Sequence, residues 1–321
     1  MEMHRREKGG RHVSWLTQFR KQGMLQLFVL AGIVYIFIFH YIPMFGLIIG
    51  FKDYKITTGI AGMLTSKWVG LKHFKEFFGD YKFGELMRNT LVLSILKLVC
   101  SFPVPIILAV FINEVRNRPL KKFIQTVSYL PYFISWVIVS GMLKIMADES
   151  GIINQVIVAL GISPRPLELL TSPKYFYPIA ILTAIWKDSG WWTIIFLAAI
   201  TGIDPTLYEA AEIDGAGRVR KMVDITLPSI APTVTVVLIM ALGNLLGGGL
   251  SGSNFEQCYL LGNAGNIEVS DIIQTYVMRI GLSNARYSYA TAVGMFQSVI
   301  SVILVYTSNM ISKKVSGKGL F

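Results

Sequence analysis

Six long apolar segments constrain the fold of this chain more than any other feature. A helix needs about 20 mostly apolar residues to cross the hydrocarbon core of a bilayer. The segments of this kind cover residues 25–50, 86–113, 123–147, 175–200, 231–250 and 287–311. Because apolar runs of this length cross a membrane as helices, the sequence predicts an all-α integral membrane protein with six transmembrane helices.

The composition agrees with a membrane protein. Charged residues make up 15% of the chain, against about 25% in soluble domains, and the mean hydropathy is +0.54. These values argue against a soluble enzyme, a disordered protein and a fibrous protein. The net charge of +11 fits cytoplasmic loops beside membrane lipid, so we expect no nucleic-acid partner. The two cysteines, Cys100 and Cys258, form no Cys-x-x-Cys motif, which excludes a disulfide scaffold and a structural zinc site.

The distribution of lysine and arginine predicts the orientation. With the N-terminus inside the cell, the inner segments carry 16 of these residues in 72 positions, and the outer segments carry 10 in 97. The first outer loop, with six lysines, departs from the trend, but the positive-inside rule still favours both termini in the cytoplasm. The outer segments are 51–84, 148–174 and 251–286. We divide the chain into a cytoplasmic N-terminal segment, a six-span domain and a cytoplasmic tail, at residues 1–24, 25–311 and 312–321.

The polar segment 204–230 predicts a compact helix–turn–helix on the cytoplasmic side. Asp204 is a good N-cap and Pro205 a good first helical residue. Gly215 breaks this helix, and a second, amphipathic helix follows until Pro228 stops it. The narrow apolar stripe of the second helix indicates a protein partner.

The same segment carries a long, ordered motif. The pattern E-A-A-x-x-x-G-x₉-I-x-L-P is matched without a gap by Glu209, Ala210, Ala211, Gly215, Ile225, Leu227 and Pro228. This motif resembles the EAA loop of the permease subunits of bacterial ABC importers, and it lies at the expected place before the penultimate span. Asp214, directly before the glycine, completes the set of residues that the resemblance assigns to ATPase coupling.

Further stretches extend the resemblance over nearly the whole chain. They are similar to the polysaccharide and oligosaccharide permeases of the carbohydrate-uptake group, the branch that includes the lipoprotein-linked permeases of Gram-positive bacteria. The matching stretches are 41–54, 68–78, 88–91, 113–118, 125–136, 186–191, 271–282 and 287–294. The glycine-rich segment 246–254 departs from the family because it is longer, which leaves the geometry at the outer end of the fifth span open.

The resemblance implies a type I ABC importer permease fold with cytoplasmic EAA coupling helices, in the bacterial cell membrane. It implies a non-catalytic subunit that forms half of the translocation pathway for an oligosaccharide. The implied partners are a second permease in a heterodimer, a dimer of ATP-binding-cassette ATPases and an extracellular substrate-binding lipoprotein. ATP and Mg²⁺ would bind to the ATPases, so this chain would bind no cofactor of its own.

The resemblance also implies how the motif works. The EAA helix docks in a groove on the ATPase, and closure of two ATPases on ATP moves the spans from inward-open to outward-open. Glu209 would pair with a basic group of the ATPase, with a solvated surface charge as the alternative. Gly215 would permit the tight turn between the two helices.

The residues themselves offer no catalytic, nucleotide or metal site. A P-loop requires G-x-x-x-x-G-K-[ST], and Gly317-Lys318 is followed by another glycine. The sequence contains no HExxH motif, no nucleophile elbow and no paired-histidine metal site. The energy for transport must therefore come from a partner.

Polar residues within the spans are candidates for the substrate pathway, because a charge in a membrane is costly unless it faces protein or water. Lys97 lies near the middle of the second span. Lys187 and Asp188 lie among tryptophans, and two interpretations stay open: they line a polar cavity in which tryptophans bind sugar rings, or they bridge neighbouring helices. The pathway candidates are Lys187, Asp188, Trp191, Trp192, Trp136, Tyr132 and Asn244.

Two other classes of function remain as alternatives. A self-sufficient secondary transporter of a small polar solute would need several acidic residues within its spans, and only Asp188 is found. An integral membrane enzyme would need a cluster of His, Asp or Glu at the inner helix ends, which the sequence lacks.

Overall fold

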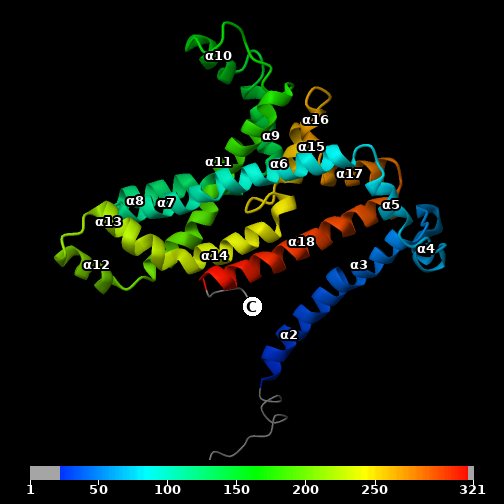
Figure 1. Cartoon of the computed structure of the whole chain (residues 1–321), viewed down its shortest axis with the longest axis horizontal. Helices are drawn as coiled ribbons and strands as arrows, with labels where there is room; N and C mark the ends of the chain where they lie inside the picture. The colour runs from blue at the N-terminus through cyan, green and yellow to red at the C-terminus, as the bar shows by residue number, and fades with distance from the viewer. Residues whose placement is uncertain (1–21, 317–321) are drawn as a thin grey trace, which may run out of the picture.

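The computed structural model describes residues 22–316, and the elements in this part of the chain are helical apart from one isolated bridge between Lys52 and Trp68. The helices form an elongated assembly with α12 and α13 at one end and α4 and α5 at the other (Figure 1). The predicted all-α fold is therefore confirmed. Most of the expected segment 1–24 and half of the expected tail 312–321 lie outside the described residues.

Four helical stretches are long and apolar enough to cross a membrane on their own. They are Gly23–Phe51, Phe83–Glu114, Arg218–Gly243 and Tyr287–Lys314. Two bent pairs of helices meet the same requirement when each pair is taken together. These pairs are Arg118–Phe133 with Trp136–Met146, bent by 97°, and Pro173–Thr201 with Pro205–Ile213, bent by 69°. The described residues therefore provide up to six spans, in agreement with the sequence.

The first span stands apart from the other helices except at its end, where the segment Phe45–Phe51 contacts α18. It contains α2 (Gly23–Ile36) and α3 (Ile42–Met44) and continues in a 3₁₀ turn to Phe51 (Figure 1). No residue of α2 is buried. This helix therefore leaves its apolar surface free for lipid or for another chain.

Two short helices connect the first span to the second. They are α4 (Gly59–Thr65) and α5 (Lys72–Phe78). Phe77 on α5 is 1% exposed, and it packs in a cluster that also contains Leu86 and Tyr289. This packing fixes α5 to the second span and to the last one.

The second, third and fourth spans form the central part of the assembly. The second consists of α6 (Phe83–Ser101) and α7 (Pro103–Glu114), and the third of α8 (Arg118–Tyr129) and α9 (Trp136–Met146). The 97° bend of the third span follows Pro131. Ser135 is the N-cap of α9, and its Oγ accepts a hydrogen bond from the backbone N–H of Ile138. After α10 (Ile152–Ala159), the long helix α11 (Pro173–Thr201) contacts α6, α7 and α8.

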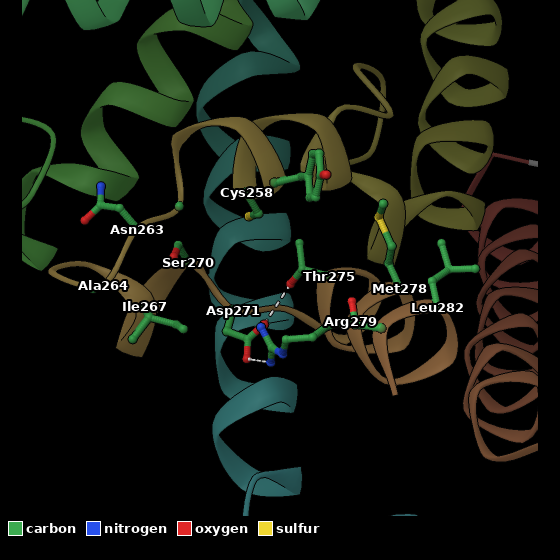
Figure 2. Close-up of a pocket in the computed structure, with 13 residues that line it drawn as sticks. Cys258, Asn263, Ala264, Ile267, Ser270, Asp271, Thr275, Met278, Arg279 and Leu282 are labelled. Atoms are coloured by element: carbon green, nitrogen blue, oxygen red, sulfur yellow. Dashed lines mark hydrogen bonds and ion pairs between the residues drawn. The ribbon is translucent and has the colours of Figure 1, made fainter. Parts of the chain in front are cut away.

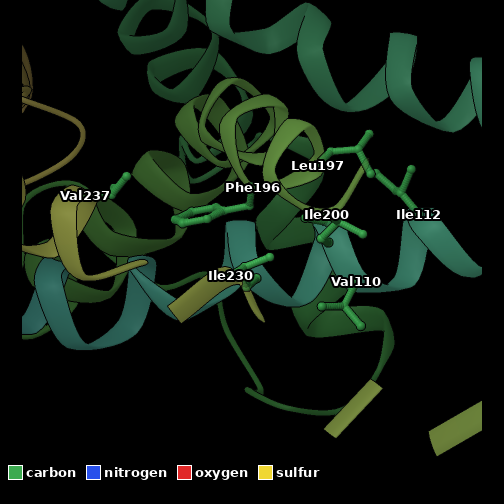
Figure 3. Packing of buried hydrophobic residues seen from close by; sticks show 8 residues of the cluster. Val110, Ile112, Phe196, Leu197, Ile200, Ile230 and Val237 are labelled. Atoms are coloured by element: carbon green, nitrogen blue, oxygen red, sulfur yellow. The ribbon is translucent and has the colours of Figure 1, made fainter. Parts of the chain in front are cut away.

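A hydrophobic core lies where α7, α11 and α14 (Leu227–Gly243) meet. Figure 3 shows Phe196 of α11 and Ile230 of α14 within it, and these side chains are 0% and 1% exposed. The other buried members are Ala109, Val110, Ile112, Leu197, Ile200 and Val237. Since α11 leads into the segment 204–230 and α14 leads out of it, this core anchors both ends of that segment.

The second helix of the segment 204–230 does not stop at Pro228, contrary to the prediction. Instead, α13 (Arg218–Lys221) continues through a π-turn into α14, and residues 218–243 form one helix. Proline lacks an N–H group and crowds the preceding turn. Here the N–H of Leu227 donates to the carbonyl of Met222, five residues earlier, and this wider turn accommodates the proline.

The fifth span also ends earlier than the predicted 231–250. Helix α14 ends at Gly243, and the residues after it fold into the interior as a buried loop, which we call the glycine-rich loop (residues 244–253). Gly248, Gly249 and Gly252 have φ values of 109°, 64° and 60°, in the region that favours glycine. The chain then continues as α15 (Asn254–Leu261), α16 (Ile267–Ser270), α17 (Ile273–Met278) and α18 (Tyr287–Ser316).

Candidate functional site

The first helix of the segment 204–230, α12 (Pro205–Ile213), begins at a capped N-terminus. Asp204 Oδ1 accepts a hydrogen bond from the backbone N–H of Thr206 at 2.9 Å. This bond, with the side chain of Thr206, holds the pKa of the Asp204 carboxyl below its usual value. The ionised carboxylate also interacts favourably with the positive end of the helix. Asp204 is thus the N-cap that the sequence predicts.

Gly215 forms the turn after α12. Its φ is 76°, a conformation that side chains with a Cβ rarely adopt. The N–H of Ala216 donates to the carbonyl of Ala211 at 2.8 Å, and the N–H of Gly215 donates to Glu212 at 3.1 Å, which closes the end of the helix. A Cβ at Gly215 would meet no heavy atom within 4 Å, so the backbone conformation, and not lack of space, requires glycine here.

Two side-chain contacts that were not predicted from the sequence hold α12 against the helix that follows it. The hydroxyl groups of Tyr208 and Thr226 lie 2.9 Å apart. Lys221 Nζ lies 3.4 Å from Glu212 Oε2. Because each pair joins two different helices, helical spacing in the sequence gives no signal of these contacts.

The first half of the E-A-A motif, residues 209–215, lies on the exposed surface of α12 and the turn that follows it. Glu209 is exposed, and its carboxylate makes no hydrogen bond or ion pair within the described residues. Leu207 and Ile213 are 49% and 88% exposed. The other exposed motif residues are Ala210, Asp214 and Gly215, and Ala211 is half-buried. An ionisable side chain beside exposed apolar ones is suited to a protein partner.

The second half of the motif lies elsewhere, at the entry to the fifth span. Ile225 belongs to the π-turn and is half-buried. Leu227 and Pro228 are the first two residues of α14, and both are exposed. These residues shape the junction between the cytoplasmic helix and the span, and not the surface of α12.

Five of the seven predicted pathway residues meet at the middle of α11. Lys187 Nζ donates to the carbonyl of Tyr132 at 2.8 Å and lies 3.7 Å from Asp188 Oδ1. The same ammonium lies 5.1 Å from the ring centroid of Tyr132 and 5.5 Å from that of Trp136. The rings of Tyr132 and Trp191 stack, with centroids 4.6 Å apart. Lys187 and Asp188 are each 6% exposed, so these contacts connect α11 to the bend before α9.

The remaining two candidates, Trp192 and Asn244, hold the glycine-rich loop. Trp192 Nε1 donates to the carbonyl of Leu250 at 3.1 Å. Asn244 Nδ2 donates to the carbonyl of Gly249 at 3.0 Å, and its own carbonyl accepts from the N–H of Gly249. The structure therefore separates these two residues from the aromatic cluster around Lys187.

A second polar cluster lies where α6, α11 and α15 approach one another. Lys97 is 1% exposed and donates to Ser253 Oγ at 3.1 Å. Asn254 Nδ2 donates to Ser94 Oγ at 2.9 Å. Three buried side-chain oxygens here accept no hydrogen bond from the described residues, and they belong to Asp188, Asn254 and Gln257. Ser253, Asn254 and Gln257 are not among the predicted pathway residues, because they lie in the expected outer segment 251–286.

Within the residues that the structure describes, no three His, Cys, Asp or Glu side chains gather as a metal site would require. That ATP and Mg²⁺ bind to a partner stays a prediction.

The chain is similar to known proteins over nearly its whole length. The family described as binding-protein-dependent transport system inner membrane component matches residues 101–317. The polygalacturonan/rhamnogalacturonan transport system permease protein YteP of Bacillus subtilis is 45% identical over 307 residues, which cover 95% of this chain and 92% of that protein. Protein LplB of the same organism is 42% identical over 313 residues, covering 97% and 95%.

Solved structures show the same likeness. A chain of the bacterial alginate ABC transporter, in complex with the alginate pentasaccharide-bound periplasmic protein, matches with a TM-score of 0.84 and 38% identity. The match covers 95% of this chain and 99% of that one.

Proposed function

Because the chain belongs to the family of binding-protein-dependent transport system inner membrane components, we propose that it forms half of the membrane pathway of an ABC importer for acidic oligosaccharides. The family places it among multi-pass membrane proteins that act as transport permeases. This membership sets aside the alternatives of a self-sufficient secondary transporter and an integral membrane enzyme.

The proposed substrate carries carboxylates. One relative is named for the transport of polygalacturonan and rhamnogalacturonan, and a solved relative is involved in the import of the acidic polysaccharide alginate. All three polysaccharides contain uronic acids.

The exposed surface of α12 is the observation that carries the proposed coupling. An ATPase subunit would dock on α12, with Glu209 on its surface, and would hydrolyse ATP with its own catalytic groups and Mg²⁺. Residues 218–243 form one helix that ends at the glycine-rich loop. A displacement of α12 would therefore be passed to the fifth span and to that loop.

The proposed assembly requires further partners. A second permease would form the other half of the pathway, and α2, which has no buried residue, offers an apolar surface to it. An extracellular substrate-binding lipoprotein would deliver the oligosaccharide at the end of the assembly opposite α12 and α13 (Figure 1). The complex of the alginate transporter with its periplasmic protein supports this arrangement.

A pair of glycine substitutions tests the coupling. We expect Gly215→Val to reduce co-purification of the ATPase and ATP-driven uptake of oligosaccharide into proteoliposomes, because a β-branched residue is strained at a φ of 76°. Gly161→Val is the matched control, since Gly161 also has a positive φ, 70°, and open space around its Cβ position. The control should retain both activities. If Gly215→Val and Glu209→Gln both keep ATPase binding and uptake, α12 is not the docking surface.

A further inference from the structure

We infer that the cavity beside α15 and α17 binds a carboxylate-bearing sugar unit of the transported oligosaccharide, with Arg279 on the carboxylate and Tyr259 against the sugar ring. This inference rests on the proposed function and adds a substrate site outside the two polar clusters. The cavity has a volume of about 450 Å³, within the range of about 300–1,000 Å³ that is typical of small-molecule sites. Figure 2 shows its lining residues.

Arg279 supplies positive charge at the wall of the cavity. Its guanidinium pairs with Asp271, whose side chain is 1% exposed, and Lys82 Nζ lies 3.9 Å from the same carboxylate. Thr275 Oγ1 donates to the other oxygen of Asp271 at 2.9 Å, as Figure 2 shows. Two cations thus share one buried carboxylate, and Lys82 also interacts with the carboxyl of Asp80. Arg279 is the cation among the residues that line the cavity.

Arg279 also has free hydrogen-bonding capacity. Its side chain is 39% exposed, and among the described residues only Asp271 accepts a hydrogen bond from it. A guanidinium carries five N–H groups in a fixed fork that matches a carboxylate. A sugar carboxylate in the cavity can therefore bind to the unused edge of Arg279 while Asp271 holds the side chain in place.

Tyr259 provides an aromatic surface on the same cavity. Its side chain is 55% exposed, and its ring stacks on that of Phe255 with centroids 5.5 Å apart and planes 13° apart. Stacking on Phe255 fixes the orientation of the Tyr259 ring. A flat, oriented aromatic face is suited to the apolar face of a pyranose ring, and the phenol hydroxyl can bond to a sugar hydroxyl.

The rest of the lining combines hydroxyl and amide groups with apolar side chains. The polar members are Asn263, Ser270 and Ser283, and the apolar members include Ile267, Met278 and Leu282. A mostly apolar wall with a few polar groups that orient the ligand is typical of a small-molecule site. By contrast, the cavity of about 590 Å³ beside α18 is lined by no charged residue, so it offers no ionic partner to a carboxylate.

Equilibrium binding to the assembled transporter tests the inference. The permease–ATPase complex is placed in nanodiscs without the binding protein, and the probes are labelled trigalacturonate and its methyl ester, which lacks the charge. We expect the wild-type complex to bind the acid more tightly than the ester. Arg279→Gln should raise the Kd for the acid by at least about tenfold, the effect of losing a hydrogen bond between charged groups, and should leave the ester unaffected.

Matched variants show whether an effect of Arg279→Gln is specific to this site or reflects a general loss of positive charge or of folding. Arg286→Gln is the control, because Arg286 is 43% exposed and also pairs with a carboxylate, that of Glu76, but does not line this cavity. It should bind both probes as the wild type does. Arg279→Lys keeps the charge and should retain part of the affinity for the acid. Tyr259→Ala should weaken acid and ester alike.

The inference is overturned if the wild-type complex binds neither probe, if it binds the ester as tightly as the acid, or if Arg279→Gln and Arg286→Gln give the same Kd. ATP-driven uptake with the binding protein present distinguishes this failure from that of the proposed function. If the complex retains its ATPase and transports, but Arg279→Gln leaves the Kd for the acid unchanged, the inference is wrong and the proposed function stands. A complex that neither retains its ATPase nor transports overturns the proposed function.

Discussion

Lys97 on α6 donates a hydrogen bond across 3.1 Å to Ser253 Oγ, and this contact fixes the glycine-rich loop inside the protein. Ser253 Oγ lies 2.8 Å from Ser251 Oγ, while Trp192 on α11 bonds to the carbonyl of Leu250. Two spans therefore hold the loop. A buried ammonium is costly unless its protons are shared, so the contact with Ser253 both attaches the loop and accommodates the charge.

We predict that Ser253→Ala destabilises the assembled complex more than Lys97→Met does. Removal of the hydroxyl leaves the ammonium buried without this acceptor, at a cost of roughly 1–3 kcal/mol, whereas Lys97→Met replaces the charge by an apolar side chain. The double variant should be as stable as Lys97→Met alone. Thermal unfolding measures the differences, with Ser298→Ala as a control, because Ser298 is exposed and bonds within its own helix. A smaller effect of Ser253→Ala than of Lys97→Met would contradict the prediction.

The contact between α8 and α11 depends on Gly190. A Cβ at this position would stand 1.9 Å from the carbonyl oxygen of Ser128, so the two helices would have to separate. We predict that Gly190→Ala destabilises the complex by about 1–3 kcal/mol. Gly141→Ala on α9, where a Cβ meets nothing within 4 Å, should stabilise it by up to about 1 kcal/mol. Unfolding temperatures of the two variants test the packing, and wild-type stability of Gly190→Ala would refute it.

Asp80 gives the stability a dependence on pH. Burial opposes ionisation of its carboxyl, but hydrogen bonds from Tyr276 at 2.5 Å, from the backbone N–H of Lys82 and from Tyr289 outweigh it. The pKa of Asp80 therefore lies below its ordinary value of 3.8. Because the folded pKa is the lower one, Asp80 stabilises the fold above the unfolded pKa, and this contribution is lost as the pH falls through the folded pKa.

We accordingly predict that Asp80→Asn lowers the unfolding temperature at neutral pH. In this variant the unfolding temperature should also decrease less than in the wild type as the pH falls below about 4. Unfolding temperatures measured between about pH 3 and 7 test this prediction. Glu149→Gln is the control, because Glu149 is exposed and makes no hydrogen bond or ion pair through its carboxylate within the described residues. An unchanged pH profile for Asp80→Asn would show that its hydrogen bonds do not stabilise the fold.

Features that depend on length or on local geometry were predictable from the sequence. The thickness of a bilayer sets the length of a span, and the helical stretches Gly23–Phe51 and Tyr287–Lys314 begin within two residues of the predicted segments. The turn at Gly215 is equally local, because a glycine between two helical patterns is enough to indicate it. Membership of the family could be inferred for the same reason, because the motif around Glu209 is continuous in sequence. The match to the family confirms this inference.

Features that depend on contacts between distant segments could not be predicted. The glycine-rich loop is buried because Lys97 and Trp192, on two other spans, bind to it. Pro228 was predicted to stop a helix, but a π-turn before it allows the helix to continue. Asn244 could not be separated from the other pathway candidates, because its bond to the backbone of Gly249 depends on how the loop folds back.

The contacts of Lys187 bear on two interpretations of the polar residues in α11: they line a sugar-binding cavity, or they bridge neighbouring helices. Its ammonium bonds to the carbonyl of Tyr132, lies beside Asp188 and is almost completely buried. We therefore expect Lys187 to hold α11 to the bend before α9, and not to bind the sugar.

We predict that Lys187→Met lowers the unfolding temperature by an amount equivalent to roughly 1–3 kcal/mol, because the carbonyl of Tyr132 and the carboxylate of Asp188 lose their buried partner. The complex that remains folded should take up oligosaccharide with an unchanged half-saturating concentration. Lys174→Met is the matched control on the same helix, since Lys174 is exposed, and it should alter neither quantity. Thermal unfolding and uptake into proteoliposomes are measured on the same preparations. Wild-type stability combined with a raised half-saturating concentration would instead place Lys187 in the substrate pathway.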